Sequence, residues 1–183
     1  MRVYIAIDFE DNTKNYFNRI VSDIKKHCTE GKFTEENNFH LTIRFIGEAD
    51  ELQIKKIKEA IDKAVLNINP FELSVNNLGV FKKKRTNILW TGIEENAALS
   101  ELHKELSISL KERKLPFYDK LFMPHITLGR RVLFNEESPD LDNLINFERI
   151  MIPVKAISLM ASKEADGKLN GISLYKVNLI TLI

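Results

Sequence analysis

The chain has 183 residues, with 27 Lys and Arg against 26 Asp and Glu, so its formal charge is +1. This length suits one domain with a sizeable core, and 44% hydrophobic with 29% charged residues excludes a disordered chain. Because the net charge is close to zero, any affinity for anions such as nucleic acids must come from local groups.

The first half of the chain reads as strand, helix, strand, helix. Residues 2–9 (RVYIAIDF) are rich in β-formers, and Asp11 or Asn12 can cap the helix that follows. The apolar positions of this helix recur at helical spacing: Phe17, Ile20, Ile24 and Cys28. Residues 39–47 predict the second strand, and Asp50 begins a second amphipathic helix.

The second half repeats this alternation. Residues 71–81 and 87–93 predict two strands, and the helix after them carries a leucine stripe: Leu99, Leu102, Leu106 and Leu110. The remaining elements are a strand at 122–130, a short helix within 138–147, and closing strands at 151–162 and 171–183. We therefore expect an α+β fold with residues 1–183 in a single bilobal domain. Its two pseudo-symmetric lobes would each be an antiparallel-rich sheet with helices on the outer face and a cleft between them.

Composition also limits the setting of the protein. Cys28 is the only cysteine, which excludes an intrachain disulfide framework and a cysteine-rich zinc site. The N-terminal apolar run is too short and too interrupted for a signal peptide, and no later stretch reaches membrane-spanning length. We expect a cytoplasmic protein with no membrane partner.

Two stretches share one pattern, His-apolar-Thr-apolar: HLTIRF at 40–45 and HITLGR at 125–130. Residues two apart in a strand lie on the same face, so each strand should present its histidine beside its threonine and bury the apolar residues between them. The side chains concerned are His40 and Thr42, and His125 and Thr127. If the two strands meet at a cleft, two imidazoles and two hydroxyls surround one small space.

Such a group of side chains suits cleavage of a phosphodiester. Histidine can act as acid or base near neutral pH, and threonine hydroxyls can donate hydrogen bonds to oxygens that gain charge in the transition state. The alternatives are a structural role for either histidine alone and a two-histidine metal site. Neither strand offers a carboxylate on the same face, which argues against the metal site. His27 and His103 lie on predicted helices, and we interpret both as structural or solvated.

The paired His-x-Thr-x motifs, placed behind an N-terminal RVYIAIDF strand, resemble the signatures of the two-histidine (2H) phosphoesterase superfamily. Within it, the chain is most similar to the RNA 2′,3′-cyclic phosphodiesterases, also called 2′-5′ RNA ligases. The resemblance implies hydrolysis of RNA 2′,3′-cyclic phosphate ends to 2′-phosphomonoesters, with His40 as proton donor and His125 as acceptor. It implies that Thr42 and Thr127 hold the phosphate oxygens without a metal or cofactor, that the substrates are RNA ends or small cyclic-phosphate nucleotides, and that reversible 2′-5′ RNA ligation is a further reaction. We expect a monomer with no obligate protein partner.

Two other functions are compatible with the sequence. The chain could be a module that binds nucleotides or RNA ends without turnover, although both histidines and both threonines are present. It could also be a 2H phosphodiesterase that acts on 2′-5′ oligonucleotides or on another cyclic nucleotide. The shared motif recognises phosphate, whereas the loops determine the rest of the substrate.

The basic residues near the motifs are harder to place. Arg130 could pair with phosphate, yet strict alternation puts it opposite His125, unless Gly129 allows a bulge. Alternation puts Arg44 beside Thr42, where it would line the rim of the cleft and contact RNA. Residues 82–85 (KKKR) could bind RNA phosphates, but a solvated hairpin turn is favoured.

Three aromatic residues are candidates for stacking on RNA bases: Phe9, Phe45 and Tyr118. Alternation predicts that Phe45 follows Leu41 and Ile43 into the core, which argues against a role for it in stacking.

Overall fold

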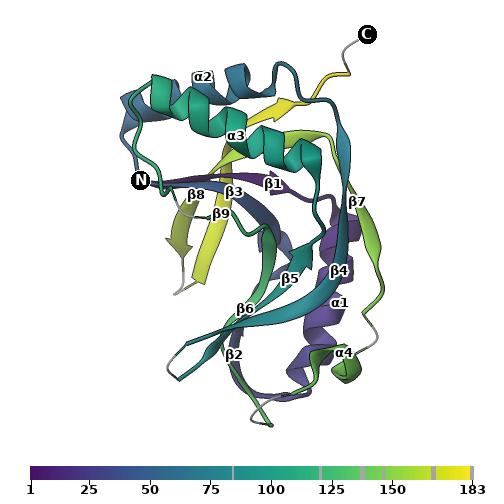
Figure 1. Ribbon diagram of the computed structural model, residues 1–183. Helices are drawn as coiled ribbons and strands as arrows, with labels where there is room; N and C mark the ends of the chain where they lie inside the picture. Colours follow the sequence, from purple (N-terminus) through teal and green to yellow (C-terminus); the bar gives the residue numbers. More distant parts are fainter. Residues whose placement is uncertain (84, 120, 137–138, 146, 166–167, 182–183) are drawn as a thin grey trace.

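The computed structural model describes residues 1–83, 85–119, 121–136, 139–145, 147–165 and 168–181, and its described strands form one curled antiparallel sheet (Figure 1). The strands are β1 (Arg2–Asp8), β2 (Cys28–Phe33), β3 (His40–Glu48), β4 (Phe71–Lys82), β5 (Asn87–Ile93), β6 (His125–Phe134), β7 (Ile150–Val154), β8 (Ala156–Ala165) and β9 (Lys168–Asn178). The helices are α1 (Asp11–Lys25), α2 (Glu51–Val65), α3 (Ala97–Glu112), the short α4 (Leu141–Leu144) and a 3-10 turn at Glu36–Asn38.

The sheet runs in the order β7-β4-β5-β6-β3-β1-β8-β9, and β2 pairs with the far end of β6. Strands β3 and β6 meet at one register pair, Leu41 with Ile126, where the sheet divides into two lobes. One lobe contains β1, β3, β8 and β9, and the other contains β2 and β4 to β7. The predicted fold class, a bilobal α+β architecture with antiparallel sheets, is confirmed.

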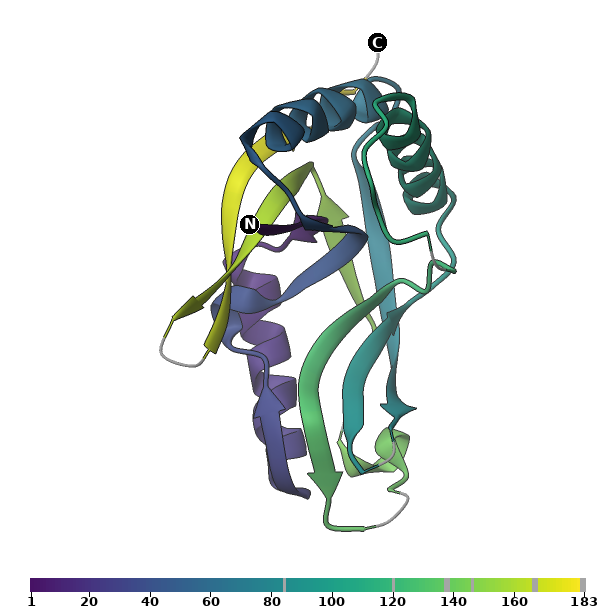
Figure 2. The same ribbon diagram turned by 90° about the vertical axis from the view of Figure 1, so that its left-hand side faces the viewer.

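The two halves of the sequence exchange elements between the lobes. Strand β2, from the first half, pairs with β6 in the second lobe, while β8 and β9 extend the lobe of β1 and β3. Helices α2 and α3 lie side by side at one end of the molecule, and α1 lies near β2 and β6 (Figures 1 and 2). Each lobe is therefore built from both halves of the chain.

Three sequence predictions about elements are wrong. Residues 28–33 form an exposed strand rather than the end of the first helix. The segment 151–162 is not one strand, because it divides between β7, which pairs with β4, and β8, which pairs with β1. The first helix also begins after Glu10, with neither predicted residue at its N-cap.

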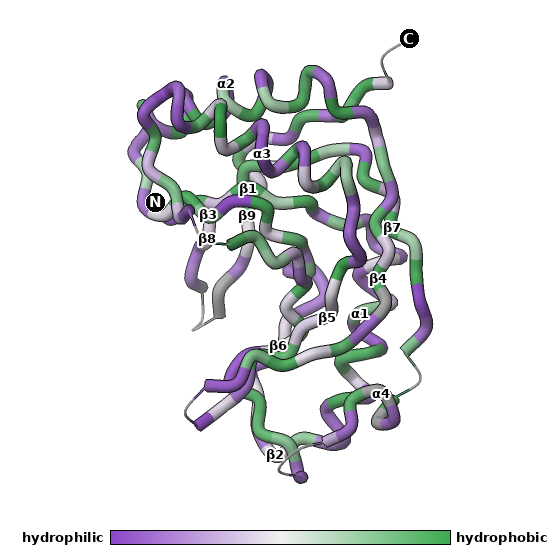
Figure 3. The backbone as a smooth tube through the Cα atoms, in the orientation of Figure 1, coloured by the Kyte–Doolittle hydropathy of each residue, from purple (hydrophilic) through white to green (hydrophobic). Residues whose placement is uncertain are grey.

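The helices contact the sheet through one apolar face each. Along α2 and α3, hydrophobic and hydrophilic residues alternate over short intervals, as Figure 3 shows. The start of α2 has the predicted cap, since the Asp50 side chain accepts a hydrogen bond from the Gln53 backbone N–H and the Gln53 side chain accepts one from Asp50 N–H. The apolar faces of α2 and α3 hold these helices over the lobe that carries β3.

A β-bulge follows the threonine in each motif strand. In β3, Thr42 pairs with Ala6 but Arg44 pairs with Ile5, so Ile43 is the extra residue. Because the extra residue reverses the alternation, Arg44 enters the core and the next residue returns to the face of the histidine. The prediction from strict alternation is therefore wrong for the residues after Thr42.

The second motif strand has its bulge at the same offset. In β6, Thr127 pairs with Trp90 while Gly129 pairs with Leu89, which leaves Leu128 as the extra residue. Gly129 is buried and Arg130 is exposed. The bulge proposed at Gly129 is present, and it brings Arg130 to the face of His125.

Candidate active site

The site forms where β3 and β6 touch. Leu41 and Ile126 face each other on the core side, and both are 0% exposed. The opposite face carries the four predicted side chains, which are all partly exposed: His40, Thr42, His125 and Thr127. Antiparallel geometry places each histidine across from the threonine of the other strand. The structure thus brings together four residues from motifs 85 positions apart in the sequence.

Both imidazole rings are held in the same way. Nδ1 of His40 lies 2.7 Å from the backbone oxygen of Asn38, and Nδ1 of His125 lies 2.7 Å from that of Met123. A carbonyl oxygen only accepts, so Nδ1 must carry the proton in each ring. Nε2 is then the atom of each histidine that is left to bind or release a proton.

His40 is positioned by strand β9 and by an aromatic neighbour. The Asn38 side chain accepts a hydrogen bond from Gly171 N–H (3.0 Å) and donates one to Asn170 Oδ1 (3.1 Å). The ring of Tyr4 lies 4.9 Å from the ring of His40. The residue whose carbonyl orients His40 is therefore itself anchored to strand β9.

Burial lowers the pKa of the His40 imidazole below its usual value. The hydrogen bond to Asn38 and the carboxylate of Asp8 act in the opposite direction, whereas Arg130 and Lys14 lower the pKa further. Lys14 also forms an ion pair with Asp8 at 2.8 Å. In the free protein, His40 is consequently neutral near pH 7.

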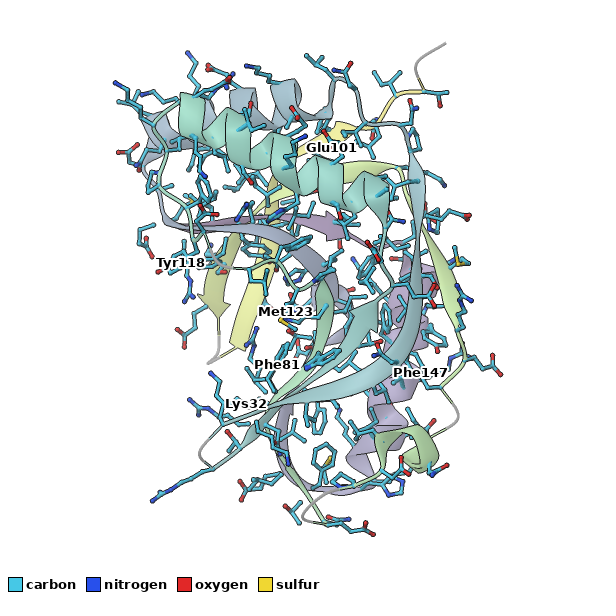
Figure 4. All side chains as sticks on the ribbon, in the orientation of Figure 1. Lys32, Phe81, Glu101, Tyr118, Met123 and Phe147 are labelled. Carbon is cyan, nitrogen blue, oxygen red and sulfur yellow. The ribbon has the colours of Figure 1, made fainter. Side chains whose placement is uncertain are left out.

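His125 has a different environment, with two aromatic rings beside it. The ring of Phe81 meets His125 edge-on at 5.2 Å, and the ring of Trp90 lies 6.4 Å away. Figure 4 shows the labelled Phe81 and Met123 close together in this part of the molecule. Sequence reasoning missed Tyr4, Phe81 and Trp90, because their proximity to the histidines depends on pairing between distant strands.

Arg44 does not belong to the site. It is 5% exposed, and its guanidinium donates to Ser107 Oγ on α3 (Nε at 3.1 Å) and to the backbone oxygen of Tyr118 (3.2 Å). It also pairs with Asp119 at 3.6 Å. The prediction that Arg44 lies beside Thr42 on the rim of the cleft is wrong, and the bulge in β3 is the physical reason.

Arg130 lies on the face of the histidines and close to a second cation. Partial desolvation, and then the like charge of Arg2, lower the pKa of Arg130, whose own charge acts on His40. The guanidinium of Arg2 lies 4.8 Å from the ring centre of Phe45. Arg130 therefore adds positive charge to the histidine face within electrostatic range of His40, and Arg2 lies over the ring of Phe45, which packs against Tyr4 on the same face.

Of the three aromatic candidates for stacking on RNA bases, Phe45 does not lie where the sequence predicts. Phe45 is partly exposed and packs with Tyr4 on the histidine face, contrary to the prediction that it enters the core. Phe9 is buried, and Tyr118 contacts Phe45 with ring centres 5.1 Å apart. Of the basic turn at 82–85, the three residues other than Lys84 are exposed, and Lys84 lies outside the described residues.

Within the described ranges, no three His, Cys, Asp or Glu side chains lie close enough together to hold a metal ion. The four motif side chains are two imidazoles and two hydroxyls, and the neighbouring carboxylate of Asp8, which pairs with His40 across β1 and β3, is held in an ion pair by Lys14. None of the described helices is both long and apolar enough to cross a membrane.

Comparison with known proteins supports a single family. A family model described as LigT-like phosphoesterase matches residues 7–90. The RNA 2′,3′-cyclic phosphodiesterase of Thermotoga maritima is 32% identical over 163 residues, which are 88% of this chain and 87% of that protein. The protein of the same name from Methanocaldococcus jannaschii is 31% identical, over 71% of each chain.

Solved structures support the same fold. Escherichia coli LigT, crystallised with 3′-AMP, superposes with a TM-score of 0.81 at 22% identity, over 98% of each chain. A protein of Thermus thermophilus superposes with a TM-score of 0.79 at 20% identity, also over 98% of each chain.

Proposed function

Because the chain belongs to the RNA 2′,3′-cyclic phosphodiesterases, the LigT-like branch of the 2H phosphoesterases, we propose that it hydrolyses RNA 2′,3′-cyclic phosphate ends to 2′-phosphomonoesters. One observation carries this proposal. Two His-x-Thr strands touch at a single register pair, and both histidines are oriented through Nδ1, with Nε2 left for proton transfer. This arrangement supplies an acid and a base on the two sides of one phosphate.

The reaction is an in-line displacement at phosphorus. Nε2 of His125 takes a proton from water, and the water oxygen bonds to phosphorus. The bond from phosphorus to the 3′ oxygen breaks, and protonated His40 gives its Nε2 proton to that oxygen. The hydroxyls of Thr42 and Thr127 donate to the non-bridging oxygens, which gain charge in the transition state. The same steps with a 5′-hydroxyl in place of water would form a 2′-5′ linkage.

The pKa of His40 fits an acid that becomes active when substrate binds. Burial keeps His40 neutral in the free protein, whereas an anionic phosphodiester a few ångströms away favours the imidazolium. Substrate binding and proton uptake by His40 are then coupled. The bound phosphate thus favours a proton on the atom that faces the leaving oxygen.

Arg130 is the remaining candidate for substrate binding. Its place on the histidine face, within electrostatic range of His40 and Arg2, provides positive charge for an anionic RNA end. A guanidinium can bind a phosphate of the RNA strand through two hydrogen bonds. We assign Arg130 to the RNA rather than to proton transfer.

The test is an assay with an RNA oligonucleotide that ends in a 2′,3′-cyclic phosphate, run in parallel with a 2′-5′-linked dinucleotide and 3′,5′-cyclic AMP, all with EDTA. We expect a 2′-phosphomonoester product, identified by ³¹P NMR, and no reaction of the 3′,5′-cyclic nucleotide. Binding of the RNA end without turnover would instead identify a binding module. Activity that is lost in EDTA and restored by zinc or manganese would contradict the metal-free mechanism.

A further inference from the structure

A pocket of about 400 Å³ opens directly beside His125. Its walls include the side chains of Phe81, Trp90, Phe122 and Met123, and Asn77 contributes a polar group. The proposed hydrolysis uses only water on this side of the phosphate, and a water molecule needs a small fraction of such a volume. The mechanism described above therefore leaves most of this pocket without a ligand.

The aromatic wall of the pocket is well supported. Phe81 and Trp90 are stacked with ring centres 5.0 Å apart and planes at 29°, and Phe81 also contacts His125. A Cβ atom on Gly79 would lie 2.3 Å from the Trp90 ring, so the indole occupies space that any other residue at position 79 would fill. Met123, 54% exposed, adds a polarisable side chain next to these rings.

Asn77, which lines the pocket together with the polar residues Glu94 and His125, is also fixed in orientation. Oδ1 of Asn77 accepts a hydrogen bond from the backbone N–H of Gly92 at 3.1 Å, so its amide NH₂ group remains as a donor. Aromatic faces with one oriented amide are the elements with which proteins stack and read a nucleobase. The volume lies within the range of pockets that bind small organic ligands.

The position of the pocket relative to the reaction indicates which nucleoside it holds. In an in-line displacement, the attacking and leaving oxygens lie on opposite sides of phosphorus. The pocket adjoins His125, and its walls include neither His40 nor Tyr4. The 3′ oxygen of the ribose that carries the cyclic phosphate leaves toward His40, while the 2′ oxygen stays bonded to phosphorus, so the pocket lies on the side from which the attacking oxygen arrives.

We propose that this pocket is a second nucleoside site, which binds the nucleoside whose 5′-hydroxyl replaces water. In 2′-5′ joining, His125 takes the proton of this hydroxyl, its oxygen bonds to phosphorus, the bond to the 3′ oxygen breaks, and His40 protonates that oxygen. In the reverse direction, the 3′-hydroxyl of a 2′-5′ linkage gives its proton to His40 and attacks phosphorus. The 5′-linked nucleoside then leaves from the pocket with a proton from His125. This inference rests on the proposed function.

Binding can be measured without any reaction. Trp90 is the only tryptophan of the chain, so its fluorescence reports on this pocket alone. We expect adenosine, which has a 5′-hydroxyl and no phosphate, to change Trp90 fluorescence saturably. Phe81→Ala should weaken binding about 5- to 100-fold, the usual worth of one base stacked on an aromatic side chain. Val80→Ala, on the neighbouring core-facing residue, is the matched control and should bind adenosine like the wild type.

A kinetic comparison tests the assignment of sides. The kcat/KM for cleavage of a 2′-5′-linked diadenosine should fall in Phe81→Ala about 10-fold more than the kcat/KM for hydrolysis of adenosine 2′,3′-cyclic phosphate. An equal loss in both reactions would overturn the proposal, because Phe81 would then act through His125 or hold the other nucleoside. Wild-type adenosine affinity in Phe81→Ala would overturn it as well.

The two proposals fail in different ways. If the wild type does not hydrolyse cyclic phosphate ends, the proposed function fails, while the adenosine titration still shows whether the pocket binds a nucleoside through Phe81. If hydrolysis is normal and adenosine at millimolar concentration leaves Trp90 fluorescence unchanged, the second nucleoside site fails and the proposed function stands.

Discussion

Leu41 and Ile126 face each other across the junction of the two histidine strands, and each is flanked by the polar residues of its motif. Both side chains are fully buried. The packing of these two apolar residues therefore sets the distance between the two imidazoles on the opposite face.

Leu41→Ala should displace the two histidines relative to each other as well as lower stability. Removal of a buried leucine side chain costs about 2–5 kcal/mol in the free energy of unfolding. A displacement of about 1 Å between acid and base costs about 10²-fold in rate. Ile46→Ala, also buried in β3 but beyond the bulge, is the control. Denaturant unfolding should show similar losses for both variants, and kcat should fall only in Leu41→Ala.

The histidines should differ in their response to the leaving group. His40→Ala and His125→Ala should each lose about 10²–10⁴-fold in kcat, and the losses should not add in the double variant, because both residues act on one transition state. A substrate with an activated leaving group needs little protonation. Such a substrate should restore the kcat of His40→Ala far more than that of His125→Ala. The reverse result would mean that His125 is the acid and His40 the base.

The threonine hydroxyls should each contribute to transition-state binding. Thr42→Val and Thr127→Val keep the shape of the side chain and remove one donor, which costs up to about 10²–10³-fold in kcat. Thr91→Val is a useful comparison, because Thr91 is buried in the neighbouring strand and donates to the backbone oxygen of Asn77. It should lose stability but should not reproduce the loss in kcat at saturating substrate.

The pKa of His40 should respond to the charge at Arg130. The positive charge of Arg130 lowers this pKa, so Arg130→Gln should raise it toward the usual value near 6.5. NMR titration of the His40 ring protons measures the shift directly. Arg131→Gln, at the adjacent position, should leave the titration unchanged. In kcat/KM profiles, the limb that belongs to His40 should move to higher pH in Arg130→Gln alone.

The two arginines near the motifs should behave in opposite ways. Arg44→Met removes hydrogen bonds to Ser107 and Tyr118 and should cost about 1–3 kcal/mol of stability, with little change in KM for RNA. Arg130→Gln should keep stability and raise KM for RNA. It should also reduce by about one the slope of the logarithm of the binding constant against the logarithm of salt concentration. A raised KM for RNA in Arg44→Met, with unchanged stability, would contradict the structural assignment.

His103 should make stability depend on pH. Burial, then the nearby charge of Arg44, lower its pKa to about 4, and its ring stacks on Phe122 at 4.0 Å. The unfolded chain takes up a proton below about pH 6.5, whereas the folded protein does so only near pH 4. Stability should thus fall as the pH decreases across this interval. In His103→Gln, thermal unfolding should show a shallower dependence on pH over the same range.

The sequence was sufficient to predict the fold class, the family and the four motif residues that the structure brings together, whose catalytic roles remain predictions. Alternation within one strand identified these residues because each motif lies before its bulge. The same argument failed for Arg44 and Phe45, since a bulge arises from pairing with β1 and is not visible in the sequence of β3. Strand β2 was missed because its residues are mostly exposed and lack an apolar alternation.

The neighbours of the histidines were not predictable for a related reason. Tyr4 reaches His40 through the pairing of β1 with β3, and Trp90 reaches His125 through the pairing of β5 with β6. Neither contact has a counterpart in local sequence spacing. The pocket beside His125 has the same origin, because its walls come from β4, β5 and the segment before β6.

The exchange of β2, β8 and β9 between the lobes has a consequence for how the chain can be divided. A cut in the connection between α2 and β4 would leave each fragment with a sheet that lacks strands supplied by the other. Neither fragment should fold alone, yet the two together should reassemble, because their missing edges are complementary. The lobes are in this sense interlaced rather than consecutive, and we expect the two histidines to share one cooperative unfolding transition. Co-expression of residues 1–68 with residues 69–183 would recover the site only when both pieces are present.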